Sequence, residues 1–175
     1  MTRTFELTMA ELRAVARFAV ESAETVLTSY EESYPDDPRP RAAVNAAWEF
    51  VNGAPRTKLQ RVAALDAHRA AAAAGTEIAR LAARAASDAA AAAYLHPLAN
   101  GNQVGHILRS AALAARIAEL HAGSDPRVGE EHLEQALRRA TPVVIEVLNR
   151  YPRAPLSKNR AGALMNQLDA SMRRP

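Results

Sequence analysis

The amino-acid sequence predicts an all-α fold, a single-domain antiparallel helical bundle of about seven to eight helices. The chain is rich in alanine, the best helix former. Its apolar residues recur at spacings of three and four, while glycine and proline fall between the periodic segments. No segment alternates as a strand does. With 175 residues and 49% hydrophobic content, the chain is long enough to bury one core.

The first helix is predicted to begin at the stretch "TMAE". Thr8 and Glu11 stand at the spacing of a capping box, in which each side chain accepts a hydrogen bond from the backbone of the other. The apolar residues that follow lie on one helical face as far as Tyr30. We expect the helix to end near Tyr34, before Pro35.

The second helix is predicted to follow the loop "PDDPRPR". Asp37 can act as its N-cap, and Pro38 suits the first helical position. The helix should stop at Asn52 and Gly53, a pair typical of turns.

A second capping box, formed by Thr57 and Gln60, opens the third helix. Gly75 is placed where a glycine C-cap would end it. The fourth helix runs from Glu77 to about Leu95 and is dense in alanine, which lets neighbouring backbones approach closely. It is therefore predicted to be the central helix of the bundle.

The stretch "YLHPLANGNQVGHILRS", from Tyr94 to Ser110, is predicted to be the corner between the fourth and fifth helices. Asn102 is expected to cap the fifth helix, which places His106 in its first turn. His96 ends the preceding helix because Pro97 disfavours helical geometry there.

The last third of the chain contains one helical period that Thr141 and Pro142 interrupt. This pattern predicts either a kink or two helices with Thr141 as the second cap. Four apolar residues at helical spacing predict a short terminal helix: Leu164, Met165, Leu168 and Met172. We therefore expect a helical bundle over residues 1–155, followed by a loop and a short C-terminal helix over residues 156–175.

The composition excludes several classes of site. No cysteine is present, so the chain has no disulfide, no thiolate nucleophile and no cysteine-ligated metal. The N-terminal segment has no uninterrupted apolar run of the secretory type, and no stretch reaches the roughly 18 apolar residues of a membrane span. A cytoplasmic protein that is not in a membrane is expected.

The formal charge of +3 comes almost entirely from arginine, since Lys58 and Lys158 are the only lysines. The arginines alternate with acidic residues instead of gathering on one face. The stretch "GEEHLEQALRRATPVVIEVLNRYP" can form two helices, but the second lacks the polar and basic side chains of a recognition helix. These patterns argue against nucleic-acid binding.

Two stretches, "YPDDPRPRAAVNAAWEFVNG" and "ASDAAAAAYLHPLANGNQVGHILRSAALAARIAEL", carry a family resemblance. Through them the chain resembles the Imm-5-like immunity protein family, over about Leu12 to Tyr151. The resemblance implies a small all-α domain and a role in binding. Actinobacterial members of this family often carry the label of the exonuclease subunit SbcC. That label fails on this sequence, because neither lysine follows a phosphate-binding G-x-x-x-x-G-K-[ST] loop and long coiled-coil arms are absent.

The corner holds the first candidate site. If the fourth and fifth helices form an antiparallel hairpin, His96 and His106 lie at one end, where they can converge with Arg109 and Asp88. Such histidines can contact a ligand, move protons or bind a metal. The alternative is that they only organise the turn. The sequence offers no H-x-x-x-H or H-E-x-x-H spacing for a metal, so we assign no metal site.

Arg39 and Arg41, beside Asp36 and Asp37, form the second candidate site. Two arginines at a helix N-terminus can bind a carboxylate or a phosphate. The alternative is a helix start with a local ion pair.

Two functional interpretations stay open on the sequence. The first is a non-enzymatic binding or interaction protein that neutralises or sequesters a partner, as the family resemblance implies. The second is a small all-α enzyme or ligand-binding protein of actinobacterial specialised metabolism, with a pocket lined by histidine and arginine.

The candidate ligand-binding residues are His96, His106, Arg109, Arg39 and Arg41; no catalytic residue and no cofactor is assigned. The partner is a protein or a small molecule, and a homodimer is compatible with the alanine-rich faces.

Overall fold

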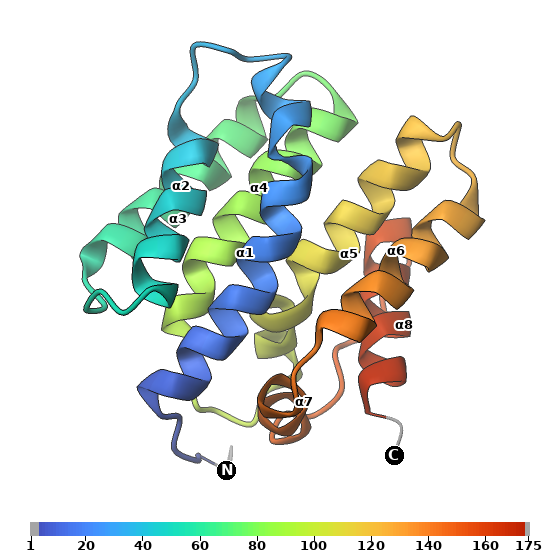
Figure 1. Cartoon of the computed structure of the whole chain (residues 1–175). Coiled ribbons are helices and arrows are strands. Elements are labelled where there is room, and N and C mark those ends of the chain that lie inside the picture. Colours follow the sequence, from blue (N-terminus) through green and yellow to red (C-terminus); the bar gives the residue numbers. More distant parts are fainter. Residues whose placement is uncertain (1–3, 174–175) are drawn as a thin grey trace.

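A computed structural model describes residues 4–173 and shows the predicted all-α fold (Figure 1). In this range the only β-type pairing is an isolated antiparallel bridge between Thr4 and Leu98. The helices are α1 (Met9–Glu31), α2 (Arg39–Val51), α3 (Lys58–Ala73), α4 (Glu77–Ala91), α5 (Val104–His121), α6 (Pro126–Arg139), α7 (Pro142–Asn149) and α8 (Arg160–Met172). Two short 3-10 turns, η1 (Ala92–Tyr94) and η2 (Gly101–Gln103), form the corner between α4 and α5.

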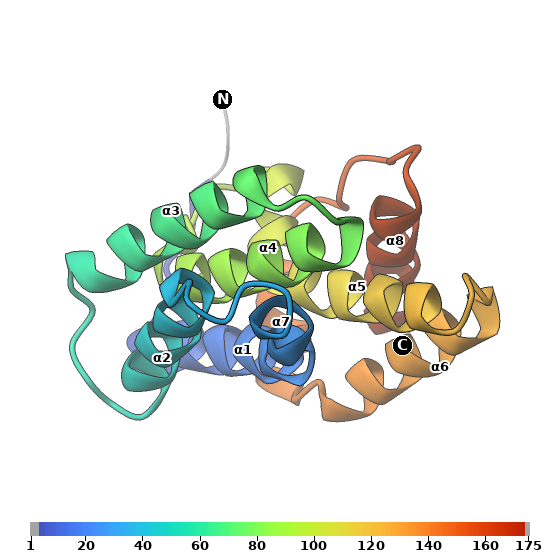
Figure 2. The same cartoon turned by 90° about the horizontal axis from the view of Figure 1, so that it is seen from above.

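Helix α4 lies at the centre of the bundle, as its alanine content predicts. It packs against α1, α2, α3 and α5, and Figure 2 shows it enclosed by these helices. Its side chains Ala82, Ala83, Ala86 and Ala89 have no exposed surface. A methyl group fills little space, so four neighbouring helices can approach α4 closely and still exclude water.

Three of the predicted caps are confirmed. Thr8 and Thr57 each form a complete capping box, with Glu11 and Gln60 as the reciprocal partners. Thr141 caps α7 by accepting a hydrogen bond from the Val144 N–H at 3.4 Å. The interruption at residues 141–142 therefore separates two helices, α6 and α7, and is not a kink.

Two other caps were predicted at the wrong residue. The N-cap of α2 is Pro38, although the Asp37 carboxylate still accepts a hydrogen bond from the Arg39 N–H at 3.1 Å. At the corner, Asn100 accepts a hydrogen bond from the N–H of Asn102, so Asn102 lies inside the η2 turn and does not cap α5. At the start of α2 the predicted side chain still accepts a backbone hydrogen bond, whereas at the corner this role belongs to Asn100, two residues before the predicted Asn102.

The ends of α1 and α3 also differ from the prediction, and the two differences are linked. Helix α1 ends at Glu31, before the predicted Tyr34. The C-cap of α3 is Ala74 in an extended conformation, so Gly75 does not take the left-handed geometry of a glycine cap. Instead the Gly75 N–H donates to the Tyr34 hydroxyl at 2.7 Å, which fixes the loop after α1 beside the start of α4.

The C-terminal helix α8 packs on α5 and α6. Leu164, Leu168 and Met172 are buried there, at 0%, 0% and 1% exposure. The terminal helix predicted from these residues is confirmed, and its first turn faces residues of α4 and α5.

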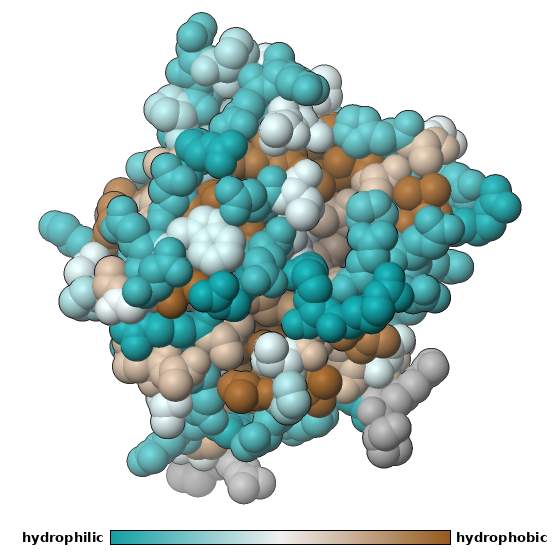
Figure 3. Space-filling model, in the orientation of Figure 1, coloured by the Kyte–Doolittle hydropathy of each residue, from teal (hydrophilic) through white to brown (hydrophobic). Residues whose placement is uncertain are grey.

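The outer surface is polar with small apolar areas between charged groups, as Figure 3 shows for one face. None of the helices in residues 4–173 combines the length and the apolarity needed to cross a membrane.

Candidate functional site

The corner after α4 is fixed by backbone groups on either side of His96. The N–H of His96 donates to the Gln103 side-chain oxygen at 3.0 Å, and its carbonyl accepts from the Tyr151 hydroxyl at 2.8 Å. The side chain of His96 is exposed. These contacts favour the structural alternative for His96, because its backbone fastens the corner to the segment after α7.

His106 lies in the first turn of α5, as predicted, and is half-buried. Its Nδ1 atom is buried with no hydrogen-bond partner among the described residues. Burial lowers the pKa of His106 below its usual value; the Asp88 carboxylate opposes this shift, while Arg109 and His96 add to it. The neutral imidazole is therefore favoured.

Asp88 and Arg109 form the ion pair that links α4 to α5. Arg109 Nη1 donates to Asp88 Oδ1 at 3.0 Å, and the Asp88 side chain is only 9% exposed. Asp88 Oδ2 is buried without a partner in the described part of the chain. Burial raises the pKa of Asp88, and the positive charge of Arg109 only partly offsets this effect. The structure thus brings Asp88, His106 and Arg109 together, as the hairpin geometry predicts.

Gly105 leaves the space that the Arg109 guanidinium occupies. A Cβ atom on Gly105 would lie 2.1 Å from Nη2 of Arg109, which is too close for any real contact. Glycine inside a helix is unfavourable by about 1 kcal/mol relative to alanine. Its presence in the first turn of α5 is explained by the guanidinium that folds over it.

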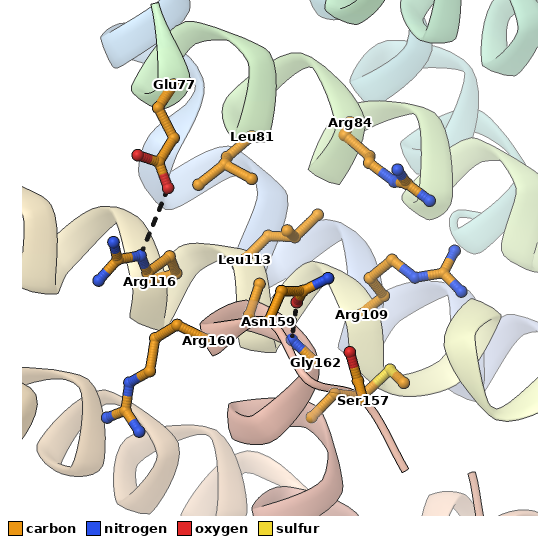
Figure 4. Close-up of a pocket in the computed structure, with 12 residues that line it drawn as sticks. Glu77, Leu81, Arg84, Arg109, Leu113, Arg116, Ser157, Asn159, Arg160 and Gly162 are labelled. Atoms are coloured by element: carbon orange, nitrogen blue, oxygen red, sulfur yellow. Dashed lines mark hydrogen bonds and ion pairs between the residues drawn. The ribbon is translucent and has the colours of Figure 1, made fainter. Parts of the chain in front are cut away.

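A cavity of about 400 Å³ lies between α4, α5 and the first turn of α8 (Figure 4). Of the predicted site residues, only Arg109 lines it; His96 and His106 do not. The walls are mainly arginine and apolar side chains. They include Arg84, Arg109, Arg116 and Arg160, together with Glu77, Leu81, Leu113, Asn159 and Met165.

The buried carboxylate of Glu119 binds two of these arginines and holds them in place. Its side chain is 1% exposed and accepts hydrogen bonds from Arg160 Nε at 3.0 and 3.1 Å and from Arg116 Nη1 at 3.1 Å. Burial alone would raise the pKa of Glu119, but the hydrogen bonds from Arg160 and Arg116 outweigh burial and lower it. Gly129 of α6 leaves the necessary space, because a Cβ there would lie 2.1 Å from Glu119 Oε1.

A second cavity, of about 600 Å³, adjoins the corner itself. It shares Arg109, Ser157 and Met165 with the first cavity and also includes Gly105 and Lys158. Arg109 therefore stands between the corner predicted as a site and the arginine-lined cavity.

The second candidate pair, Arg39 and Arg41, lies away from the corner. Arg39 donates to both oxygens of Asp37 at 2.8 and 2.7 Å, and Arg41 donates to both oxygens of Glu31 at 2.8 Å. The pair is at the start of α2, beside the beginning of α4, whereas His96 follows the end of α4 (Figure 1). The length of α4, roughly 22 Å, separates the two clusters. Their internal ion pairs favour the structural alternative.

The family comparison covers most of this architecture. A family model described as "Imm-5 like putative immunity protein" matches residues 6–140. The chain belongs to this family. Neither a search of curated proteins nor a search of solved structures found a match. The matched range of the Imm-5-like chain includes helices α1 to α6, so the cavity wall that α8 supplies lies beyond it.

Several residues of the Imm-5-like site were missed on the sequence. Arg84 is an exposed charged residue on a helix, and no local pattern distinguishes it from any other surface arginine. Glu119 continues the apolar spacing of Leu108 and Ala115, which indicated a buried position. The role of Arg160 had no such signal, because it depends on where α8 packs.

The described residues of the Imm-5-like chain contain no group of three or more histidine, aspartate and glutamate side chains placed to hold a metal ion.

We expect the stability of this Imm-5-like chain to depend on pH through His106. Since burial lowers its pKa below 6.5, the unfolded chain binds a proton first as the pH falls. The free energy of unfolding should therefore decrease between about pH 7 and pH 5. The His106→Gln substitution removes this half-buried imidazole and should make the decrease less steep. Urea unfolding at each pH measures the free energy of unfolding.

The matched control is His68→Gln, on the exposed face of α3. It should leave the pH dependence of the wild type unchanged. An equally steep decrease in His106→Gln and the wild type would show that His106 does not contribute.

Proposed function

We propose that this chain is a non-enzymatic binding protein that neutralises or sequesters a partner. The observation that carries this proposal is the chemistry of the cavity walls. Arginine and apolar side chains line the cavity between α4, α5 and α8, whereas His96 and His106 lie outside it. A guanidinium stays protonated and donates hydrogen bonds, so it binds acidic groups but does not exchange protons.

Three of the four arginines that line the cavity are held in place before any partner arrives. Arg109 is paired with Asp88, and Arg116 and Arg160 are paired with Glu119. Side chains ordered in advance lose less entropy on binding. Membership of a family described as immunity proteins supports the same role, since neutralisation of a toxin is achieved by binding it.

The size of the cavity favours small-molecule binding as a second candidate function. A volume of about 400 Å³ lies within the range of about 300–1,000 Å³ that is typical of ligand sites. The enzymatic form of this alternative was predicted with histidines in the pocket wall, and neither His96 nor His106 lines this cavity.

The test is a binding experiment with the products of the neighbouring genes. Each product is purified and mixed with the full chain, and complex formation is measured by size-exclusion chromatography and calorimetry. We expect one product to form a stoichiometric complex, and co-expression to relieve the growth defect that this product causes. If no product binds, and a discrete small molecule co-purifies with the chain, partner neutralisation is wrong.

A further inference from the structure

We propose that the cavity between α4, α5 and α8 is a binding site for a small organic oxyanion, a carboxylate or phosphate attached to an apolar body, and that Arg84 and Arg109 hold its acidic group. This site goes beyond the neutralisation of a protein partner. Its test requires no partner protein.

The charge in the cavity wall is unevenly compensated. Arg116 and Arg160 share the buried carboxylate of Glu119, and Arg116 also lies 3.5 Å from Glu77. Arg84 makes no hydrogen bond and no ion pair with any described residue. Figure 4 shows the guanidinium groups of Arg84 and Arg109 on the same side of the cavity, away from that of Arg160. At the other end, Asp88 is the one carboxylate among the described residues whose charge acts on both Arg109 and Arg84, so these two arginines exceed the negative charge beside them by one.

Arg109 keeps hydrogen-bond donors for a ligand. Only its Nη1 atom donates to Asp88, and its side chain remains 30% exposed. A guanidinium carries five N–H donors in a planar fork that matches the two oxygens of a carboxylate or phosphate. The ion pair with Asp88 and the close packing over Gly105 hold the Arg109 guanidinium in one position. Its remaining donors are therefore oriented before the ligand binds.

The rest of the cavity determines what the acidic group is attached to. Leu81 and Leu113 lie between the two groups of arginines in Figure 4, and Met165 also lines the cavity. These side chains offer an apolar surface directly beside the charged end. A ligand with an apolar body gains from that surface, whereas a bare inorganic ion does not.

The first turn of α8 adds to the attraction for an anion. Residues 160–162 begin this 13-residue helix and line the cavity, so the partial positive charge of its N-terminus faces the same space. Asn159 accepts the Gly162 N–H at 2.8 Å and leaves the two preceding backbone donors outside that cap. This contribution supplements the arginines and would be small without them.

Isothermal titration calorimetry of the full chain with phenyl phosphate and with benzoate, in a buffer of low ionic strength, tests the site. We expect saturable binding of at least one of them, with a Kd of about 1 mM or tighter. The tighter of the two identifies the acidic group. Benzyl alcohol, which lacks an anionic group, should not bind. Absence of saturable binding by both anions would overturn the proposal, as would inorganic phosphate binding as tightly as phenyl phosphate.

Arg84→Gln is the decisive variant, because Arg84 is exposed and its loss breaks no hydrogen bond or ion pair among the described residues. We expect the affinity for the tighter anion to fall by about tenfold or more. Arg80→Gln, one turn away on the same helix and outside the cavity, should bind like the wild type. Equal affinity of Arg84→Gln and the wild type would overturn the assignment.

Arg109→Gln should weaken binding by a similar factor. Since it also leaves Asp88 without its partner, its melting temperature is measured alongside, and the Arg84→Gln result stands even if this second variant is unstable.

Discussion

Glu119→Ala is expected to lower the free energy of unfolding by about 3 kcal/mol. The carboxylate is 1% exposed and is bound by Arg116 and Arg160, whose side chains are 18% and 36% exposed. Removing it leaves two partly buried guanidinium groups without their shared counter-ion, and the loss of an ion-pair partner in a desolvated place is strongly destabilising. It also removes the ion pair between Arg160 of α8 and Glu119 of α5, which is one of the contacts that join these two helices. Chemical denaturation monitored by circular dichroism measures the change.

The matched control is Glu134→Ala, another glutamate that pairs with an arginine. The Glu134 carboxylate lies 3.9 Å from Arg138 on the surface of α6, and its side chain is 71% exposed. Exposed pairs of this kind contribute about 0–1 kcal/mol. If Glu119→Ala and Glu134→Ala cost the same, Glu119 does not organise the cavity wall.

Ala86→Leu is expected to destabilise the chain by about 3 kcal/mol or to prevent folding. Ala86 lies in the middle of α4 with no exposed surface, and α4 is packed against four other helices. Leucine adds three carbon atoms where the backbones approach closely, so the neighbouring helices must separate. Overpacking of a dense core commonly costs about 1–3 kcal/mol and occasionally more. The large value is expected because α4 cannot move towards solvent.

Ala72→Leu, on the exposed side of α3, is the control for this substitution. Alanine and leucine have similar helix propensities, so the difference between the two variants isolates packing. Ala72→Leu should change the free energy of unfolding by less than about 0.5 kcal/mol. Comparable stabilities of the two variants would mean that close packing does not require alanine in α4, and that its alanines only reflect the high alanine content of the chain.

Local signals explain which parts of the fold could be predicted. The capping boxes at Thr8 and Thr57 depend on side chains three residues apart, so the sequence contains all the information needed to place them. The central position of α4 follows from its alanine content. Gly75 was misjudged because its N–H is bound by Tyr34, a residue 41 positions away that no local pattern connects to it.

The site also has a part that local sequence signals predict and a part that they do not. Asp88, His106 and Arg109 could be placed together because one hairpin brings them to the same end of α4 and α5. The cavity could not be predicted, because Arg160 reaches Glu119 only through the packing of α8 on α5 and α6. Arg84 looks like any exposed helical charge until that third wall is present.

The most direct test of where binding occurs is an NMR titration of the arginine side-chain Nε–Hε signals with phenyl phosphate. If the cavity is the binding site, the signals of Arg84 and Arg109 shift most and saturate together, while those of Arg39 and Arg41 stay in place. The largest shifts at Arg39 and Arg41, or uniform shifts that do not saturate, would contradict a binding site between α4, α5 and α8.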